Sequence, residues 1–214
     1  MGHLERAESL LREATTISSR VLGKEHNISR ICLFNLANIY QTKGDLKNAE
    51  LLFMEVATLN QSLITKAYYH LSEQELSKYI LTFESVQSSI FTFSQQLLDN
   101  SNMSKICYDM TLFSKGFLLN SAQQGKQLIL GDSITAEKYN YLKSIQRQLS
   151  VEYTKPIAER KNIEDLEEKS SFIEKDLARS ILGFADTKKQ VNWLEVQQKL
   201  KQDEVAIEFV RYSF

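Results

Sequence analysis

Two segments of this chain match each other at a fixed offset. The first, LERAESLLREATTI, begins at Leu4, and the second, LKNAELLFMEVATL, begins at Leu46, so the offset is 42 residues. The matched pairs are Ala7 and Ala49, Glu8 and Glu50, Leu10 and Leu52, Leu11 and Phe53, and Glu13 and Glu55. A repeat of this length is typical of folds built from stacked supersecondary units, in which each unit buries its apolar face against the next.

The segment between the two copies, ISRICLFNLANIYQTKGDL, supplies the first helix of a helix–turn–helix unit. Its packing residues, and those of the helix that follows, are Leu36, Ala37, Tyr40, Ala49 and Phe53. The small alanines let the two helices approach closely, and the larger rings fill the space at the ends. Gly44 then provides the positive φ of a tight helix exit, and Asp45 is placed to cap the next helix.

Composition favours long helices joined by short loops. The chain has one proline and 7 glycines in 214 residues, whereas a sheet protein needs many tight turns that use these residues. Hydrophobic residues make up 43% and charged residues 25%, as in an ordinary globular protein. The sequence therefore predicts an all-α fold of stacked antiparallel helices.

After the repeat, the apolar pattern predicts two further helices. SEQE, Ser72 to Glu75, is a capping box that opens an amphipathic helix whose apolar stripe runs from Tyr79 to Leu97 in steps of three and four. The next helix, roughly 103–130, has apolar residues on more than one face and is expected to be the most buried element of this region.

The last third predicts a helical hairpin of coiled-coil character. Its apolar positions are Leu142, Ile145 and Leu149 on one helix, and Ile163, Leu166, Ser170, Ile173 and Leu177 on the other. NWLE, Asn192 to Glu195, can cap a short helix that ends near Leu200. The apolar run EVAIEFVRYSF from Glu204 then predicts a strand that suits a sheet buried on both faces. Without a sheet, we expect this run to be disordered, paired with another copy, or docked on the chain's own helices.

The order small-Ala, Tyr, Gly, Ala, Phe resembles the tetratricopeptide repeat, and the 42-residue spacing resembles the long variant of kinesin light chains and many bacterial proteins. Gln61 stands where the usual helix-ending proline would be, so we expect the second helix to continue to about Tyr69. Only one full repeat and a preceding half are present. Because about three repeats are normally needed for stability, we expect the N-terminus to be part of a longer array.

The resemblance also implies where a partner would bind, because the first helix of each such repeat lines a concave groove. By helical spacing, the residues on that side are Phe34, Asn35, Asn38 and Gln41. An asparagine amide offers a donor and an acceptor, so it can bind a peptide backbone of any sequence. In kinesin-light-chain-like repeats an asparagine at the position of Asn35 has this role. The alternative is that Asn35 and Asn38 make hydrogen bonds that fix the inter-repeat loop.

A second resemblance covers most of the chain. SKGFLLNSAQ, YTKPIAERKNIEDLEE and VNWLEVQQKLKQDEVAIEFVRY resemble the helical region between the repeats and the protease domain of bacterial CHAT proteins, caspase-like peptidases associated with tetratricopeptide repeats. It implies a repeat region at 4–71, a helical linker at 72–201 and the first strand of a CHAT-type domain at 202–214. The catalytic histidine and cysteine of that family would lie further along, so the resemblance implies a non-enzymatic interaction and regulatory region.

The chain's own cysteines and histidines support that interpretation. Cys32 and Cys107 lie inside helical patterns 75 positions apart, without the spacing of a metal site or disulfide framework. No histidine is placed beside either of them at a strand end, as nucleophilic catalysis would need. Two alternatives stay open: a repeat adaptor without any protease context, and, as the weaker one, a cysteine peptidase that uses Cys107.

Charge and hydropathy give no sign of a nucleic-acid or membrane partner, so we expect the partner to be a protein or peptide. The net charge of −1 gives no global field for nucleic acid or an anionic membrane, and no stretch of 18 consecutive apolar residues is present. We expect no cofactor and no metal, because GKQLILG lacks the Lys–Ser/Thr ending of a phosphate loop and the acidic clusters have no ligand geometry. Thiols buried in helices indicate a reducing, cytoplasmic location.

Overall fold

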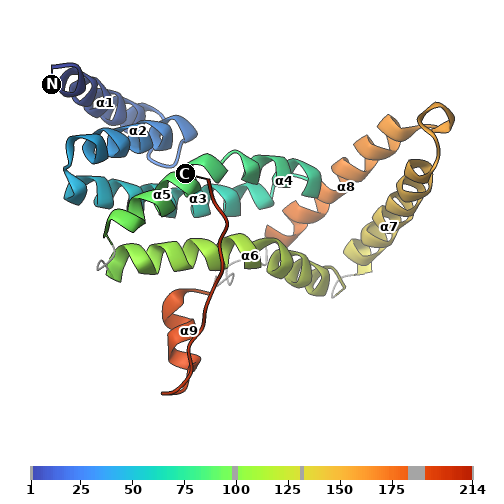
Figure 1. The fold of residues 1–214 in the computed structure, drawn as a ribbon. Coiled ribbons are helices and arrows are strands. Elements are labelled where there is room, and N and C mark those ends of the chain that lie inside the picture. The colour runs from blue at the N-terminus through green and yellow to red at the C-terminus, as the bar shows by residue number, and fades with distance from the viewer. Residues whose placement is uncertain (1, 98–100, 131–132, 183–190, 214) are drawn as a thin grey trace. The chain divides into compact units, whose positions relative to one another are not determined.

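The computed structural model describes residues 2–97, 101–130, 133–182 and 191–213, apart from the side chains of residues 101, 118–130 and 181–182. The regular elements in these ranges are helices, which confirms the predicted all-α class (Figure 1). They are α1 (Gly2–Val21), α2 (Asn27–Lys43), α3 (Leu46–Tyr68), α4 (Glu73–Leu81), α5 (Glu84–Ser94), the 3₁₀ turn η1 (Gln95–Leu97), α6 (Ser101–Leu130), α7 (Ser133–Thr154), the 3₁₀ turn η2 (Ile157–Glu159), α8 (Ile163–Leu182) and α9 (Trp193–Lys199).

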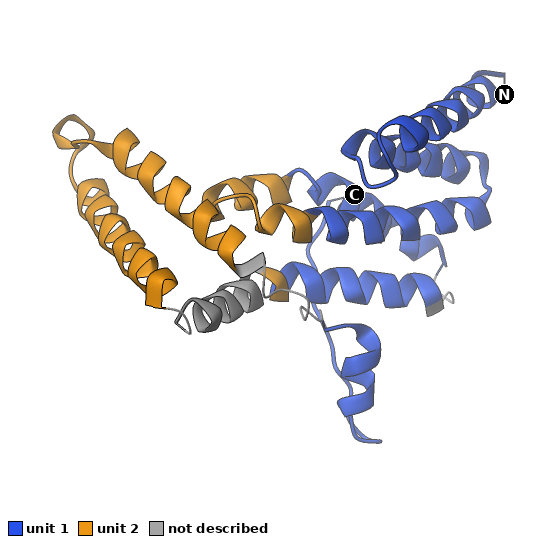
Figure 2. Cartoon of the chain, turned by 180° about the vertical axis from the view of Figure 1, so that it is seen from behind, with its two compact units in different colours: residues 1–63, 82–115, 191–214 blue, residues 64–81, 116–190 orange. Residues whose placement is uncertain are grey.

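The chain forms two compact units, which Figure 2 shows in different colours. Unit 1 contains residues 1–63, 82–115 and 191–214, and unit 2 contains residues 64–81 and 116–190. The long helices α3 and α6 each contribute to both units. The domain boundaries expected from the sequence, at residues 71 and 201, stay predictions.

The turn between α2 and α3 is formed as the sequence predicts. Gly44 has φ = 79° and donates its N–H to the carbonyl of Gln41, while Asp45 donates to the carbonyl of Tyr40. This pair of bonds closes the helix end, and only glycine adopts that backbone without strain. The Asp45 carboxylate then accepts a bond from the N–H of Asn48 at 3.2 Å and caps α3. Because Asn48 also donates its side-chain amide to this carboxylate, the pKa of Asp45 lies below its usual range.

The core of unit 1 is built where the repeat predicts it. Ala37, Ala49 and Phe53 are fully buried, and Tyr40 is buried beside them. The ring of Phe53 lies 4.7 Å from that of Phe93, so α3 and α5 are joined by aromatic packing. The remaining buried hydrophobic residues of this core are Leu33, Leu36, Val56, Ala57, Leu59, Val86, Ile90, Phe91, Met103 and Met110.

The structure divides the helix that the sequence predicted to run from Ser72 to Leu97. The chain turns after Leu81, and α5 begins at Glu84. Phe83 is buried at this turn, and its ring lies under the guanidinium of Arg30, 4.8 Å from the centroid to Cζ. A continuous apolar stripe could not reveal this break, because the stripe resumes in phase after the turn and Phe83 gains its packing partner from a distant helix.

Unit 2 contains the predicted helical hairpin of α7 and α8. Leu142 and Leu177 form its buried centre, with Tyr139 and Ile173 packed against them. The capping box is present as well: the Ser72 N–H donates to the Glu75 carboxylate at 2.9 Å, and the Glu75 N–H donates to the serine hydroxyl at 3.4 Å. Lys175 of α8 donates to the same carboxylate at 2.7 Å, which lowers the pKa of Glu75 and ties α4 to the hairpin.

The end of the chain lies in unit 1. Asn192 caps α9 by accepting the N–H of Glu195 at 3.0 Å, as the NWLE motif predicts. Asp109 of α6 accepts the N–H of Trp193, and Lys105 lies over the indole ring of that tryptophan at 4.6 Å. Burial raises the pKa of Asp109, and the N–H of Trp193 opposes that shift. After α9 the chain makes a turn at residues 202–203, closed by the Glu204 N–H donating to the carbonyl of Lys201 at 3.1 Å, and then runs on without strand pairing in its described residues up to 213.

Candidate partner-binding surface

The four residues that the sequence assigns to a partner surface lie on α2, outside its buried stripe. Asn35 is exposed, whereas Phe34, Asn38 and Gln41 are half-buried. At 100° per residue these positions follow one another around one side of the helix, next to the buried stripe that contains Leu36 and Ala37. The α2 surface, as we call these four residues, is therefore one continuous strip.

The amides of the α2 surface have no internal partner within the described residues. No hydrogen bond involves the side chains of Asn35, Asn38 or Gln41, although the backbone carbonyl of Asn38 accepts from Thr42 at 2.8 Å. Each amide can both donate and accept. The strip also has no charged side chain, so its recognition chemistry is that of neutral hydrogen bonds.

Other residues fix the inter-repeat loop, the role that we considered as an alternative for Asn35 and Asn38. The Ser29 hydroxyl, fully buried, donates to the carbonyl of Gly23 at 2.8 Å. His26 accepts the N–H of Ile28 through Nδ1 at 3.2 Å and caps α2. Serine and histidine side chains thus hold the loop at the start of the helix.

Phe34 has a structural contact as well as a surface. Its ring packs edge-on against that of Phe53, with centroids 6.2 Å apart, and it lies against the core of unit 1. Phe34 therefore packs partly in the core of unit 1, and only the rest of its side chain is available to a partner. Ile31 lies one turn before Phe34, and its side chain is 41% exposed. It is not among the residues that the sequence predicts for the partner surface. Its position three residues from Phe34 was the available signal, since i and i+3 share a helix face.

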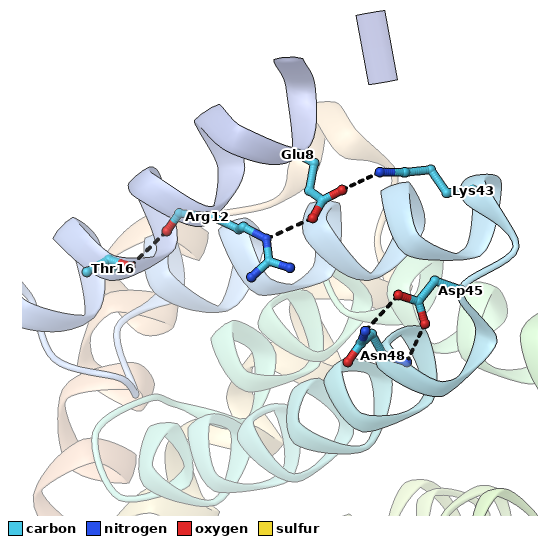
Figure 3. Close-up of polar contacts among 6 residues, drawn as sticks. All are labelled: Glu8, Arg12, Thr16, Lys43, Asp45 and Asn48. Carbon is cyan, nitrogen blue, oxygen red and sulfur yellow. Dashed lines mark hydrogen bonds and ion pairs between the residues drawn. The ribbon is translucent and has the colours of Figure 1, made fainter. Parts of the chain in front are cut away.

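A polar cluster fastens α1 to the C-terminal end of α2 (Figure 3). Glu8 of α1 accepts from Lys43 of α2 at 2.6 Å and from Arg12 at 2.8 Å. These hydrogen bonds hold the pKa of the Glu8 carboxyl below its usual range. The Arg12 guanidinium also lies 5.4 Å from the centre of the Tyr40 ring. The cluster orients the half-repeat on the full one.

A concave surface lies in unit 2, among α4, α7 and α8, with a volume of about 440 Å³. Its polar groups bond to one another. Glu167 accepts from the hydroxyl of Tyr153. Glu174 accepts from Gln146 at 3.1 Å and from the N–H of Glu73 at 3.0 Å. The acidic groups here serve to join helices.

The two cysteines of the chain lie on α2 and α6. Cys32 and Cys107 are half-buried and unbonded to each other. Burial raises the pKa of the Cys107 thiol, with a smaller opposing effect from Ser94, whereas a nucleophile needs a lowered pKa. Within the described residues no group of histidine, cysteine and acidic side chains could hold a metal ion. Similarly, none of the described helices has the length and apolar character needed to cross a membrane.

Comparison with protein families assigns the N-terminal part of the chain. Residues 1–62 match the family model described as tetratricopeptide repeat. The match covers α1, α2 and most of α3, so this part of the chain is similar to tetratricopeptide repeats, which supports the resemblance of the sequence pattern. Such repeats generally mediate protein–protein interaction, and the match supports a non-catalytic role for these residues. Comparisons with curated proteins and with solved structures gave no significant match.

Proposed function

We propose that this chain is a protein-interaction region whose repeat, residues 4–71, binds a protein or peptide partner through the α2 surface. One observation carries the proposal: the amides of Asn35, Asn38 and Gln41 lie together without internal partners, in a segment that matches a tetratricopeptide repeat. Water can reach these three side chains, and a peptide partner can replace that water with hydrogen bonds of its own.

The chemistry of the strip favours an extended peptide. A peptide backbone has alternating N–H and C=O groups. Each amide side chain can accept from one N–H and donate to one C=O. Phe34 and Ile31 add apolar area beside the amides, where a peptide side chain would pack. Because the strip is neutral, its binding should depend only weakly on salt, unlike binding between charged surfaces.

The test replaces the three amides together. A random peptide library displayed on phage is selected against residues 1–214, and the enriched peptides are synthesised and titrated. We expect the triple variant Asn35→Ala, Asn38→Ala, Gln41→Ala to bind them at least about tenfold more weakly, which corresponds to about 1.4 kcal/mol. Isothermal titration calorimetry measures the affinity, and circular dichroism verifies that the helices remain.

The matched control removes amides elsewhere. Asn140 and Gln148 are exposed on α7 in unit 2, and their replacement by alanine should leave the affinity unchanged. Enriched peptides that bind the triple variant and the parent chain equally would contradict the α2 surface as the binding site.

We further propose that residues 72–201 are a linker that passes the effect of partner binding to a caspase-like protease domain, of which residues 202–214 form the first strand. The resemblance of SKGFLLNSAQ, YTKPIAERKNIEDLEE and the stretch from Trp193 to Tyr212 to CHAT proteins supports this context. So does the continuity of α3 and α6, helices through which a change of packing can travel. A partner shifts such an equilibrium only by its differential affinity for two packings of the linker.

The coding sequence around this segment tests the protease context. If the gene continues after Phe214 into a domain with a catalytic histidine and cysteine, that longer protein is assayed for peptide cleavage with and without residues 1–71. We expect the deletion to abolish the response of cleavage to the selected peptides. Cleavage that responds equally in both proteins would contradict the relay.

The alternative is a repeat adaptor without protease context, which a stop codon directly after Phe214 would support. The docking of Tyr212 on α5, described below, favours it, since that residue then has a role within this chain. In either case we propose a bacterial, cytoplasmic protein that needs no cofactor. A peptidase using Cys107 is the weaker alternative, because burial raises the pKa of that thiol.

A further inference from the structure

The extended segment after α9 presents an apolar row to solvent. We call residues 203–213 the C-terminal arm; Figure 1 shows it in dark red between α9 and the C-terminus. Val205 is 77%, Ile207 67% and Phe209 82% exposed. Exposed side chains of this size, in a row of three at every second position, indicate an interaction surface rather than scattered surface residues.

The even-numbered side of the arm is fixed to the helices of unit 1. Glu208 forms an ion pair with Lys115 of α6 at 2.6 Å. The ring of Tyr212 packs on Phe91 of α5 with centroids 5.2 Å apart, and its hydroxyl hydrogen-bonds to Gln95. Successive side chains of an extended chain point to opposite sides, so these contacts turn the odd-numbered residues outward.

The backbone of the arm is available for pairing. Between Val205 and Arg211, no backbone hydrogen bond to another described residue is formed. An extended backbone has N–H and C=O groups along both edges, and the natural complement of such an edge is another strand. The partner that this surface fits is therefore an extended segment with an apolar face.

We propose that this segment is the arm of a second copy of the chain, paired antiparallel about a two-fold axis at Ile207. In this register Val205 lies opposite Phe209 of the other copy, and Ile207 lies opposite itself. Asp203, in the turn that leads into the extended residues, then lies opposite Arg211 at both ends of the apolar row. Asp203 and Arg211 are exposed and form no ion pair with any described residue, so both charges are available.

Charge repulsion and the match of apolar residues together disfavour the competing arrangements. A parallel, in-register pair would place Asp203 opposite Asp203 and Arg211 opposite Arg211, and like charges directly opposite are destabilising. Shifting the antiparallel pair by two residues sets Arg211 opposite Lys201 in one direction and opposite Val205 in the other. The two-fold register about Ile207 is the one that joins the apolar residues and pairs the charges.

The docked helices leave room for this pairing. The contacts that hold the arm are in its C-terminal half, at Glu208 and Tyr212. With the two-fold axis at Ile207, the contacts of one copy therefore lie at one end of the two-stranded pair and those of the other copy at the other end. At about 3.3 Å per residue, the two copies of Tyr212 lie about 33 Å apart along it, which separates the helices that they contact.

The inference does not depend on the α2 surface, and it competes with the proposed protease context. A following sheet that took up residues 202–214 as an inner strand would use the same backbone edges, so that state and the paired arm exclude each other. In a chain of residues 1–214 the paired state is the one expected. A two-stranded ribbon is marginal alone, so the dimer should be weak and concentration-dependent.

The test exchanges the two charges in residues 1–214. Asp203→Arg or Arg211→Asp alone turns both cross-copy ion pairs into like-charge pairs, and each should weaken dimerisation about tenfold. The double variant restores opposite charges and should dimerise within about threefold of the parent. Sedimentation velocity over a range of concentrations gives the dissociation constants.

A parent chain that stays monomeric at every concentration, or a double variant no better than the single ones, would overturn the proposal. A disulfide provides a second measurement. Ile207→Cys places a thiol at the two-fold axis and should form covalent dimers under mild oxidation. Ser213→Cys, which is also exposed, lies far from its counterpart in this register and should not. Equal cross-linking of the two variants counts against the register.

Discussion

Replacing Phe53 by alanine is expected to lower the free energy of unfolding of unit 1 by about 3–5 kcal/mol. Phe53 is fully buried and joins three elements, because its ring packs on Phe34 of α2 and on Phe93 of α5. Truncation removes the transfer free energy of the ring and leaves a cavity between helices that the rest of the core holds apart. It also removes the support on which Phe34 rests, so peptide binding to the α2 surface should weaken as well.

Phe172 of α8 supplies the control, since its side chain is 70% exposed. Phe172→Ala should change the unfolding free energy by less than about 0.5 kcal/mol. Urea unfolding followed by circular dichroism measures both variants, and amide hydrogen exchange locates the loss within unit 1. A loss below about 1 kcal/mol for Phe53→Ala would show that the core is not organised around this ring.

Local sequence signals predicted much of this fold. The capping box at Ser72, the glycine exit at Gly44 and the N-cap at Asn192 each depend on residues within three or four positions of one another. Such contacts can be predicted from the sequence, because both partners lie in the same short segment. The repeat and the hairpin were equally visible, because an apolar face recurs at helical spacing.

The features that the sequence did not predict depend on contacts between distant parts of the chain. The helix break before Glu84 and the burial of Arg30 both depend on Phe83, which meets a side chain 53 positions away in the sequence. The spacing of apolar residues cannot predict this contact, because neither Arg30 nor Phe83 departs from the helical pattern of its own segment. The role of the α2 surface stays a prediction, and only the structure shows that Ser29 bonds to the inter-repeat loop at the start of α2.

The second large effect is expected at Arg30, whose charged side chain is 4% exposed. Its Nη2 donates to the amide oxygen of Asn27 at 2.8 Å, and its Nη1 donates to that of Asn60, on α3, at 3.2 Å. The guanidinium also stacks on Phe83, where a cation is attracted by the face of the ring. One planar group thus ties α2 to α3 and to the turn before α5.

We expect Arg30→Ala to lower the free energy of unfolding by about 2–4 kcal/mol, because it leaves the amide oxygen of the buried Asn60 unpaired and removes the packing on Phe83. Arg30→Lys keeps the charge but has neither the planar fork nor the stacking surface, so it should recover less than half of that loss. Arg147→Ala, at an exposed site on α7, is the control and should be neutral within about 0.5 kcal/mol. Urea unfolding ranks the three variants. If lysine restored full stability, the charge alone would matter; if alanine were neutral, the three elements would be held by the apolar core without this residue.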